Sequence, residues 1–135
     1  MVGEKRVLVV DDDLNMRIFI STLLKVNGFQ PIVTKDGKEG IKKAKTDFPD
    51  LIILDIMMPE QGGISMYQQL KRDEKLKNIP VIMLSGVESH TFTHSLKIIM
   101  AGNDVRLPDP EAYVEKPPKA EALLTIIKKI LKCSD

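Results

Sequence analysis

The chain has 135 residues, of which 43% are hydrophobic and 29% charged, a composition typical of one globular domain that excludes a disordered or coiled-coil chain. Its 20 basic and 19 acidic residues give a formal net charge of +1, which argues against nucleic-acid binding as the main role. No apolar run is long enough for a signal peptide or a membrane helix, and we therefore expect a cytoplasmic protein without membrane insertion.

Short apolar segments predict five β-strands, at residues 6–10, 31–33, 51–54, 80–84 and 112–114. The first (from Val7), the third and the fourth are uninterrupted apolar runs. Such runs are typical of parallel strands that are buried on both faces.

Amphipathic stretches between these runs predict five helices. Asp13 is placed to cap a helix that runs to Val26 and stops at Asn27 and Gly28. Further helices are expected at residues 38–45, where Gly40 weakens the pattern, and at 64–72, 89–100 and 120–131. Strands that alternate with helices predict an α/β fold with right-handed crossovers, whose ligands bind at the carboxyl ends of the strands.

Polar residues follow the predicted strands at those carboxyl ends. Residues 11–13 are aspartates after the first strand, Asp55 follows the third, Ser85 the fourth, and Lys116 comes after the fifth. Two carboxylates ~5 Å apart repel by about 3 kcal/mol at an effective dielectric constant of ~20, and a magnesium ion relieves this repulsion. A hydroxyl and an ammonium group can hold phosphoryl oxygens, and a carboxylate can form an acyl phosphate. The set predicts magnesium-dependent phosphoryl transfer onto an aspartate.

Four segments together resemble the receiver domains of two-component response regulators. They are Val-Val-Asp-Asp at residues 9–12, Leu-Asp-Ile-Met-Met-Pro at 54–59, Pro-Val-Ile-Met-Leu-Ser-Gly at 80–86, and Tyr-Val-Glu-Lys-Pro at 113–117. They occur in the family's order and span roughly residues 5–132. The resemblance implies a flavodoxin-like, doubly wound parallel sheet of strand order 2-1-3-4-5 and one receiver domain over residues 1–135, with no output domain.

The resemblance also implies a role for each acidic residue. Asp55 corresponds to the phosphoacceptor. Asp12 would ligate Mg²⁺ directly, Asp11 mainly through water, and Met57 through its backbone carbonyl. Asp13 would remain a helix cap.

Further roles follow for the residues around the phosphoryl group. Ser85 would bond a phosphoryl oxygen, and Lys116 would pair with Asp55 before phosphorylation and with the phosphoryl group afterwards. Tyr113 would turn inward as Ser85 moves, and the peptide bond before Pro117 would be cis. The implied function is a switch, not an enzyme. A histidine kinase or phosphotransfer protein would phosphorylate it, and the face of strands four and five with helices four and five would bind an unidentified protein or relay the phosphate.

Two departures and two alternatives remain open. Gly62 and Gly63 stand where an Asp-Gly pair is common, and residues 103–111 are longer than the family's usual turn, so they either shape the output surface or form a neutral loop. The Asp11-x-Asp13 spacing also resembles the nucleophile motif of haloacid dehalogenase-type phosphatases. A receiver-like scaffold that is never phosphorylated is the second alternative.

Overall fold

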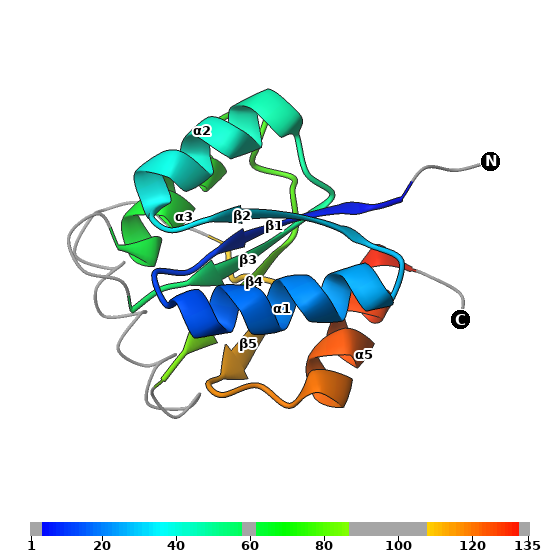
Figure 1. Cartoon of the computed structure of the whole chain (residues 1–135). Helices are drawn as coiled ribbons and strands as arrows, with labels where there is room; N and C mark the ends of the chain where they lie inside the picture. The colour runs from blue at the N-terminus through cyan, green and yellow to red at the C-terminus, as the bar shows by residue number, and fades with distance from the viewer. Residues whose placement is uncertain (1–3, 58–61, 87–107, 133–135) are drawn as a thin grey trace.

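The computed structural model describes residues 4–57, 62–86 and 108–132. Its five strands form one parallel sheet in the order β2-β1-β3-β4-β5, which confirms the predicted topology (Figure 1). The strands are β1 (Arg6–Val10), β2 (Gln30–Thr34), β3 (Leu51–Asp55), β4 (Val81–Ser85) and β5 (Ala112–Glu115). Because the strands are parallel, all their carboxyl ends meet at the same edge of the sheet.

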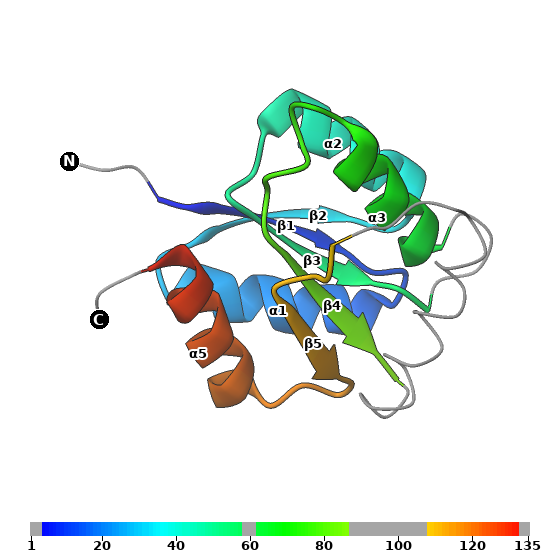
Figure 2. The same ribbon diagram turned by 180° about the vertical axis from the view of Figure 1, so that it is seen from behind.

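Helices cover both faces of the sheet. The described helices are α1 (Leu14–Val26), α2 (Gly37–Asp47), α3 (Gly63–Arg72) and α5 (Ala120–Leu131). Helices α1 and α5 lie on one face, and α2 and α3 lie on the other (Figures 1 and 2). The helix predicted at residues 89–100 lies outside the described residues. None of the described helices has the length and apolarity that a membrane crossing requires.

Local chemistry explains the helix boundaries. The Asp13 carboxylate accepts a hydrogen bond from the Asn15 backbone N–H at 3.0 Å, as the capping prediction required. Helix α1 ends at Val26 with Asn27 as its C-cap, and Gly28 follows with φ +85°, which glycine adopts without strain. Gly40 has a packing role inside α2, since a Cβ there would lie 2.8 Å from Met66 Sδ of α3.

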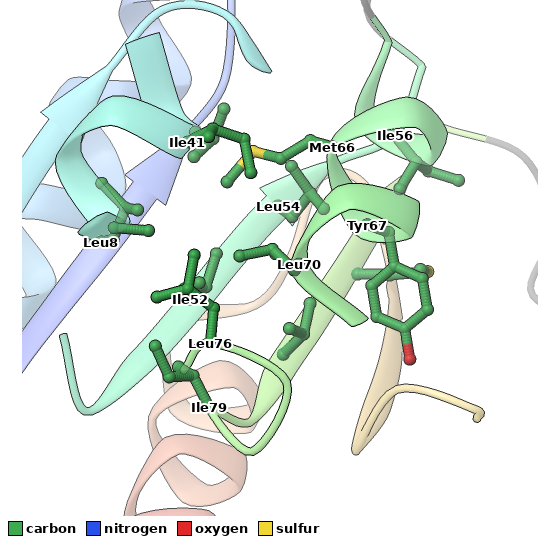
Figure 3. Close-up of a cluster of buried hydrophobic side chains, with 14 residues drawn as sticks. Leu8, Ile41, Ile52, Leu54, Ile56, Met66, Tyr67, Leu70, Leu76 and Ile79 are labelled. Carbon is green, nitrogen blue, oxygen red and sulfur yellow. The ribbon is translucent and has the colours of Figure 1, made fainter. Parts of the chain in front are cut away.

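The sheet separates two apolar cores. Alternate β1 residues divide between them: Val7 and Val9 pack under α1 and α5, and Leu8 and Val10 pack under α2 and α3. Figure 3 shows the second core, in which Met66, Tyr67 and Leu70 of α3 lie over the sheet. The first, third and fourth strands are buried on both faces, as their apolar runs predict.

Residues 108–111, the described part of the long segment before β5, are tied to the rest of the domain. The Tyr67 hydroxyl donates to the Pro108 carbonyl oxygen at 2.6 Å, and Pro110 is buried. The Glu111 N–H donates to the Val81 carbonyl at 3.0 Å, and the Val81 N–H donates to Glu111 Oε1 at 2.7 Å. These four residues, which we call the pre-β5 strap, are thus anchored to α3 and β4. Residues 103–107 lie outside the described part of the chain.

Candidate functional site

Three carboxylates converge at the carboxyl end of the sheet. Asp55 is the last residue of β3, Asp11 and Asp12 follow the neighbouring strand β1, and each of the three offers an oxygen within 4.8 Å of the others. Asp11 and Asp55 are 0% and 2% exposed, whereas Asp12 is exposed to solvent. The predicted convergence of these acids is therefore confirmed.

Lys116 reaches into this acidic cluster from the end of β5. Its Nζ atom lies 2.8 Å from Asp11 Oδ2 and 3.1 Å from Asp55 Oδ2, so the ammonium group bridges two carboxylates. The sequence led us to expect the Asp55 contact, and the shorter contact with Asp11 is an addition. Burial lowers the pKa of Lys116, but its close contact with Asp11 and the negative charge of Asp55 outweigh this effect and raise the pKa above its ordinary value.

Backbone amides orient the two buried carboxylates. The Met57 N–H donates to Asp55 Oδ1 at 3.0 Å, and the Asp13 N–H donates to Asp11 Oδ1 at 2.9 Å. Asp55 Oδ2 is the oxygen that faces Lys116. The pKa of Asp55 is nevertheless raised, first by burial and also by the charge of Asp11, because the Met57 hydrogen bond and Lys116 compensate only in part. The site therefore holds more negative charge than its own donors neutralise.

Ser85 and Tyr113, the two predicted switch residues, lie on the neighbouring strands β4 and β5. Ser85 ends β4 and is 4% exposed, one residue beyond Leu84, which pairs with Asp55. The Lys116 N–H donates to the Ser85 carbonyl at 2.7 Å, so the backbones of Ser85 and Lys116 are fixed together. Tyr113 is half-buried on β5 against the α2 and α3 core.

The peptide bond between Lys116 and Pro117 is cis, as the resemblance predicted. It directly follows the residue whose ammonium group enters the site.

Two residues that sequence reasoning missed help to build the site. Arg17 Nη1 donates to the Asp11 carbonyl oxygen at 2.8 Å, which fixes the backbone between β1 and α1. Gly63 begins α3 without a side-chain cap, and a Cβ on it would overlap the Asp55 carbonyl oxygen and the Ile56 backbone. An arginine six positions after Asp11 and a glycine pair before an amphipathic helix were the available signals, but neither pattern identifies a contact by itself.

The donor set fits a hard divalent cation. Lys116 is the cation in ion-pair contact with Asp11 and Asp55 in the described part of the chain, and its charge offsets only one of the three nearby carboxylates. Oxygen donors with surplus negative charge are what Mg²⁺ selects. Asp11, Asp12 and Asp55 are the residues that could hold it. The predicted contribution of the Met57 carbonyl stays a prediction.

The described geometry disfavours the phosphatase alternative. That chemistry needs a second acid two residues after the Asp11 nucleophile. Asp13 instead caps α1 through Oδ1, and it is not among the acids that converge with Asp11. Asp55, for which the phosphatase interpretation has no role, lies inside the cluster.

Comparisons with known proteins identify the family of the chain. A sequence model of the response regulator receiver domain matches residues 7–128. The chain is 34% identical over 130 residues to the polar-differentiation response regulator DivK of Brucella ovis, covering 94% of this chain and 96% of that protein. The crystal structure of chemotaxis protein CheY4 of Vibrio cholerae superposes with a TM-score of 0.80 at 25% identity, covering 95% and 99% of the two chains. For the receiver domain of the Francisella response regulator 1452 the TM-score is 0.78 at 31% identity, with 96% and 98% covered. The chain belongs to the response regulator receiver family.

Proposed function

We propose that this receiver domain is a signalling switch that accepts a phosphoryl group on Asp55 from the phosphohistidine of a histidine kinase or phosphotransfer protein. The observation that carries the proposal is the bridging of Asp11 and Asp55 by Lys116 within a cluster of three carboxylates. The DivK protein of Brucella ovis is matched over 96% of its own length, and we further propose that this chain is likewise a response regulator, working in the cytoplasm.

The transfer forms one bond and breaks another. A carboxylate oxygen of Asp55 forms the new P–O bond, the P–N bond to the donor imidazole breaks, and the imidazole nitrogen keeps the electron pair and is neutralised by a proton. The raised pKa of Asp55 makes its oxygens more basic than those of an ordinary aspartate. The Met57 N–H holds Oδ1 of this carboxylate, which limits its rotation.

The surrounding residues stabilise the transferred charge. Lys116 Nζ, 3.1 Å from Asp55 Oδ2, is placed to follow the phosphoryl oxygens once they are attached. Ser85, at the end of the adjacent strand, is the second donor to these oxygens. A Mg²⁺ ion bound by Asp11, Asp12 and Asp55 would neutralise the phosphoryl oxygens during transfer.

We place the donor-binding surface on the exposed side of α1. Leu14, Ile18 and Phe19 are 59%, 54% and 37% exposed, and they lie in the first turns of the helix that directly follows the acidic residues 11–13. Apolar side chains at this position suit a protein that must bring a phosphohistidine to Asp55. Ile18→Ser should slow transfer from a kinase and leave labelling by acetyl phosphate unchanged.

The output surface is the face of β4, the helix predicted at residues 89–100, β5 and α5. Ser85 and Tyr113 lie on β4 and β5, so a phosphoryl group on Asp55 can bias this face through them. A downstream protein that prefers one arrangement of the face would then read the phosphorylation state, or the phosphoryl group would pass to a further phosphotransfer protein.

Incubation with Mg²⁺ and acetyl phosphate, followed by intact-protein mass spectrometry, tests the proposal. We expect one added phosphoryl group on the unsubstituted chain and none on Asp55→Asn. Asp47→Asn, which removes a carboxylate from the last turn of α2, is the matched control and should label normally. Omission of Mg²⁺ should suppress labelling, and Asp12→Ala should weaken Mg²⁺ binding. Labelling of Asp55→Asn equal to that of the unsubstituted chain would refute the assignment and support the phosphatase alternative. No labelling of the unsubstituted chain would support the scaffold alternative.

A further inference from the structure

The beginning of α3 packs directly against the backbone of Asp55. Gly63 is the first residue of this helix and is buried. A Cβ on Gly63 would overlap the Asp55 carbonyl oxygen and the Ile56 Cα atom, and both of these are backbone atoms. No free space therefore separates the first turn of α3 from the peptide between Asp55 and Ile56. Because packed interiors transmit displacements, a shift of this peptide must move the helix.

One turn further along, α3 holds the pre-β5 strap. Tyr67 follows Gly63 by four residues, about 6 Å along the helix axis, and it is 0% exposed. Its hydroxyl donates to the Pro108 carbonyl oxygen at 2.6 Å, near the short end of the range for such bonds. Figure 3 shows the Tyr67 oxygen at the outer end of the ring. The same helix thus joins the backbone of Asp55 to the strap.

Lys71 restrains the Tyr67 ring from the next turn of α3. Its Nζ atom lies 5.4 Å from the centre of the ring, within the range of a cation–π contact. The same atom donates to the carbonyl oxygens of Lys77 and Ile79 at 3.0 and 3.4 Å. The ring is therefore held by a cation as well as by the core, and its hydroxyl is carried with the helix.

The strap has a second anchor at the amino end of β4. The Glu111 N–H donates to the Val81 carbonyl at 3.0 Å, and the Val81 N–H donates to Glu111 Oε1 at 2.7 Å. Pro108 and Pro110 have restricted backbones, and exposed Asp109 lies between them. Because this segment is short and anchored at both ends, a displacement of Pro108 changes the position of Asp109.

We propose that Tyr67 is a positioning residue that couples phosphorylation of Asp55 to the pre-β5 strap through α3. This inference rests on the proposed function, and it adds a route that does not pass through Ser85 and Tyr113. The Tyr67 bond to the strap occurs in the arrangement in which Lys116 contacts the Asp55 carboxylate.

The length of the Tyr67 bond gives the direction of the coupling. At 2.6 Å it has little room to shorten, so a shift of the Asp55 backbone lengthens it. The bond therefore stabilises the arrangement with a free Asp55 carboxylate and opposes phosphorylation. By linkage, a protein that binds the strap and breaks this bond would favour phosphorylation of Asp55.

The rate of labelling by acetyl phosphate and Mg²⁺ tests this direction. Tyr67→Phe removes the hydroxyl and keeps the buried ring, so the variant should fold. It should label about two- to tenfold faster than the unsubstituted chain, the range that one hydrogen bond's net contribution allows. Thr46→Val is the matched control, because it removes a hydroxyl that donates to the Lys42 carbonyl at 2.9 Å on exposed α2, and it should label at the unsubstituted rate. An unchanged or lower rate in Tyr67→Phe would overturn the proposal.

Amide chemical shifts separate this coupling from a merely structural role of Tyr67. Phosphorylation should shift the amide resonances of Asp109 and Glu111 in the unsubstituted chain. In Tyr67→Phe these shifts should be about twofold smaller or less, because the bond that carries them is absent. The Ser85 amide, on the other route, should respond equally in both proteins.

Two results would contradict the coupling, namely equal strap shifts in both proteins or no strap shift in the unsubstituted chain. Mass spectrometry of the same samples distinguishes the possible failures. If the unsubstituted chain is not labelled, the proposed function is refuted, and the inference with it. If the chain is labelled on Asp55 and the strap does not respond, only the inference is refuted.

Discussion

Carboxylates are paired differently at the two ends of the sheet. At the amino end, carboxylates meet single backbone donors: Asp50 Oδ2 accepts from the Arg6 N–H at 2.8 Å, and Glu111 Oε1 accepts from the Val81 N–H at 2.7 Å. At the carboxyl end, three carboxylates converge, and one ammonium group contacts two of them. This difference separates the residues that stabilise the fold from the residues that form the candidate site. One-to-one pairing fixes loops, whereas surplus negative charge creates a site that fits a divalent cation.

The largest expected effect is on the free energy of unfolding, and it comes from substituting glycines at opposite ends of the sheet. Gly63→Ala should lower the free energy of unfolding by about 3 kcal/mol, because the new Cβ meets the Asp55 and Ile56 backbone, which cannot yield as a flexible side chain can. Gly28→Ala at the amino end should cost only about 1 kcal/mol, since a Cβ there meets no described atom and the cost is that of φ +85°. Urea unfolding compares the two. Equal losses would show that α3 does not press on the phosphoacceptor backbone.

The second prediction concerns the carboxylates themselves. Because the pKa of Asp55 is raised in the folded state, its ionisation costs folding free energy, and this cost appears as the pH rises from the unfolded-state value near ~3.9 through the folded-state pKa. Without Mg²⁺, Asp55→Asn should therefore be more stable than the unsubstituted chain at pH 7, by about 1–2 kcal/mol. The gain should vanish below about pH 4.

Asp50→Asn provides the control at the amino end. Its amide oxygen can still accept from the Arg6 N–H, so we expect a change within about 0.5 kcal/mol at pH 7. Thermal unfolding in a chelator across this pH range measures both variants. A loss of stability in Asp55→Asn at pH 7 would show that Lys116 and Met57 fully compensate the charge of Asp55.

The smallest effect concerns two arginines that bond backbone carbonyls near opposite ends of β1. Arg17 Nη1 donates to the Asp11 carbonyl at 2.8 Å, and Arg6 Nη2 donates to the Phe48 carbonyl at 3.2 Å. Arg17→Lys keeps the charge but loses the planar donor, and we expect Mg²⁺ affinity to fall about two- to fivefold through misplacement of Asp12. Arg6→Lys should leave Mg²⁺ affinity unchanged. Calorimetric titration with Mg²⁺ measures the affinity of both variants. Equal affinities would show that Arg17 does not help to position the Mg²⁺ ligands.

The sequence was sufficient to predict the sheet, because burial of a parallel strand leaves an apolar run and a polar residue where the run ends. The same rule located Asp11, Asp55 and Ser85. Lys116 was also located after a predicted strand, the fifth, and the resemblance implied its contact with Asp55. Its contact with Asp11 was not predicted, since one ammonium group can reach either acid and only the fold decides.

Contacts made by the backbone could not be predicted from the sequence. Gly63 has no side chain to signal that α3 presses on Asp55, and Arg17 looks like any exposed arginine of a helix. The strap was predicted as a surface loop, which holds for exposed Asp109. Its anchoring by Tyr67 joins residues 41 positions apart and leaves no local pattern.

Chemical location of the phosphoryl group tests the central claim most directly. After incubation with Mg²⁺ and acetyl phosphate, borohydride reduces an aspartyl phosphate to homoserine, and peptide sequencing by mass spectrometry then identifies the position. We predict homoserine at residue 55 and unmodified aspartate at residues 11 and 12. Homoserine at residue 11 would contradict the account and favour a phosphatase-like nucleophile.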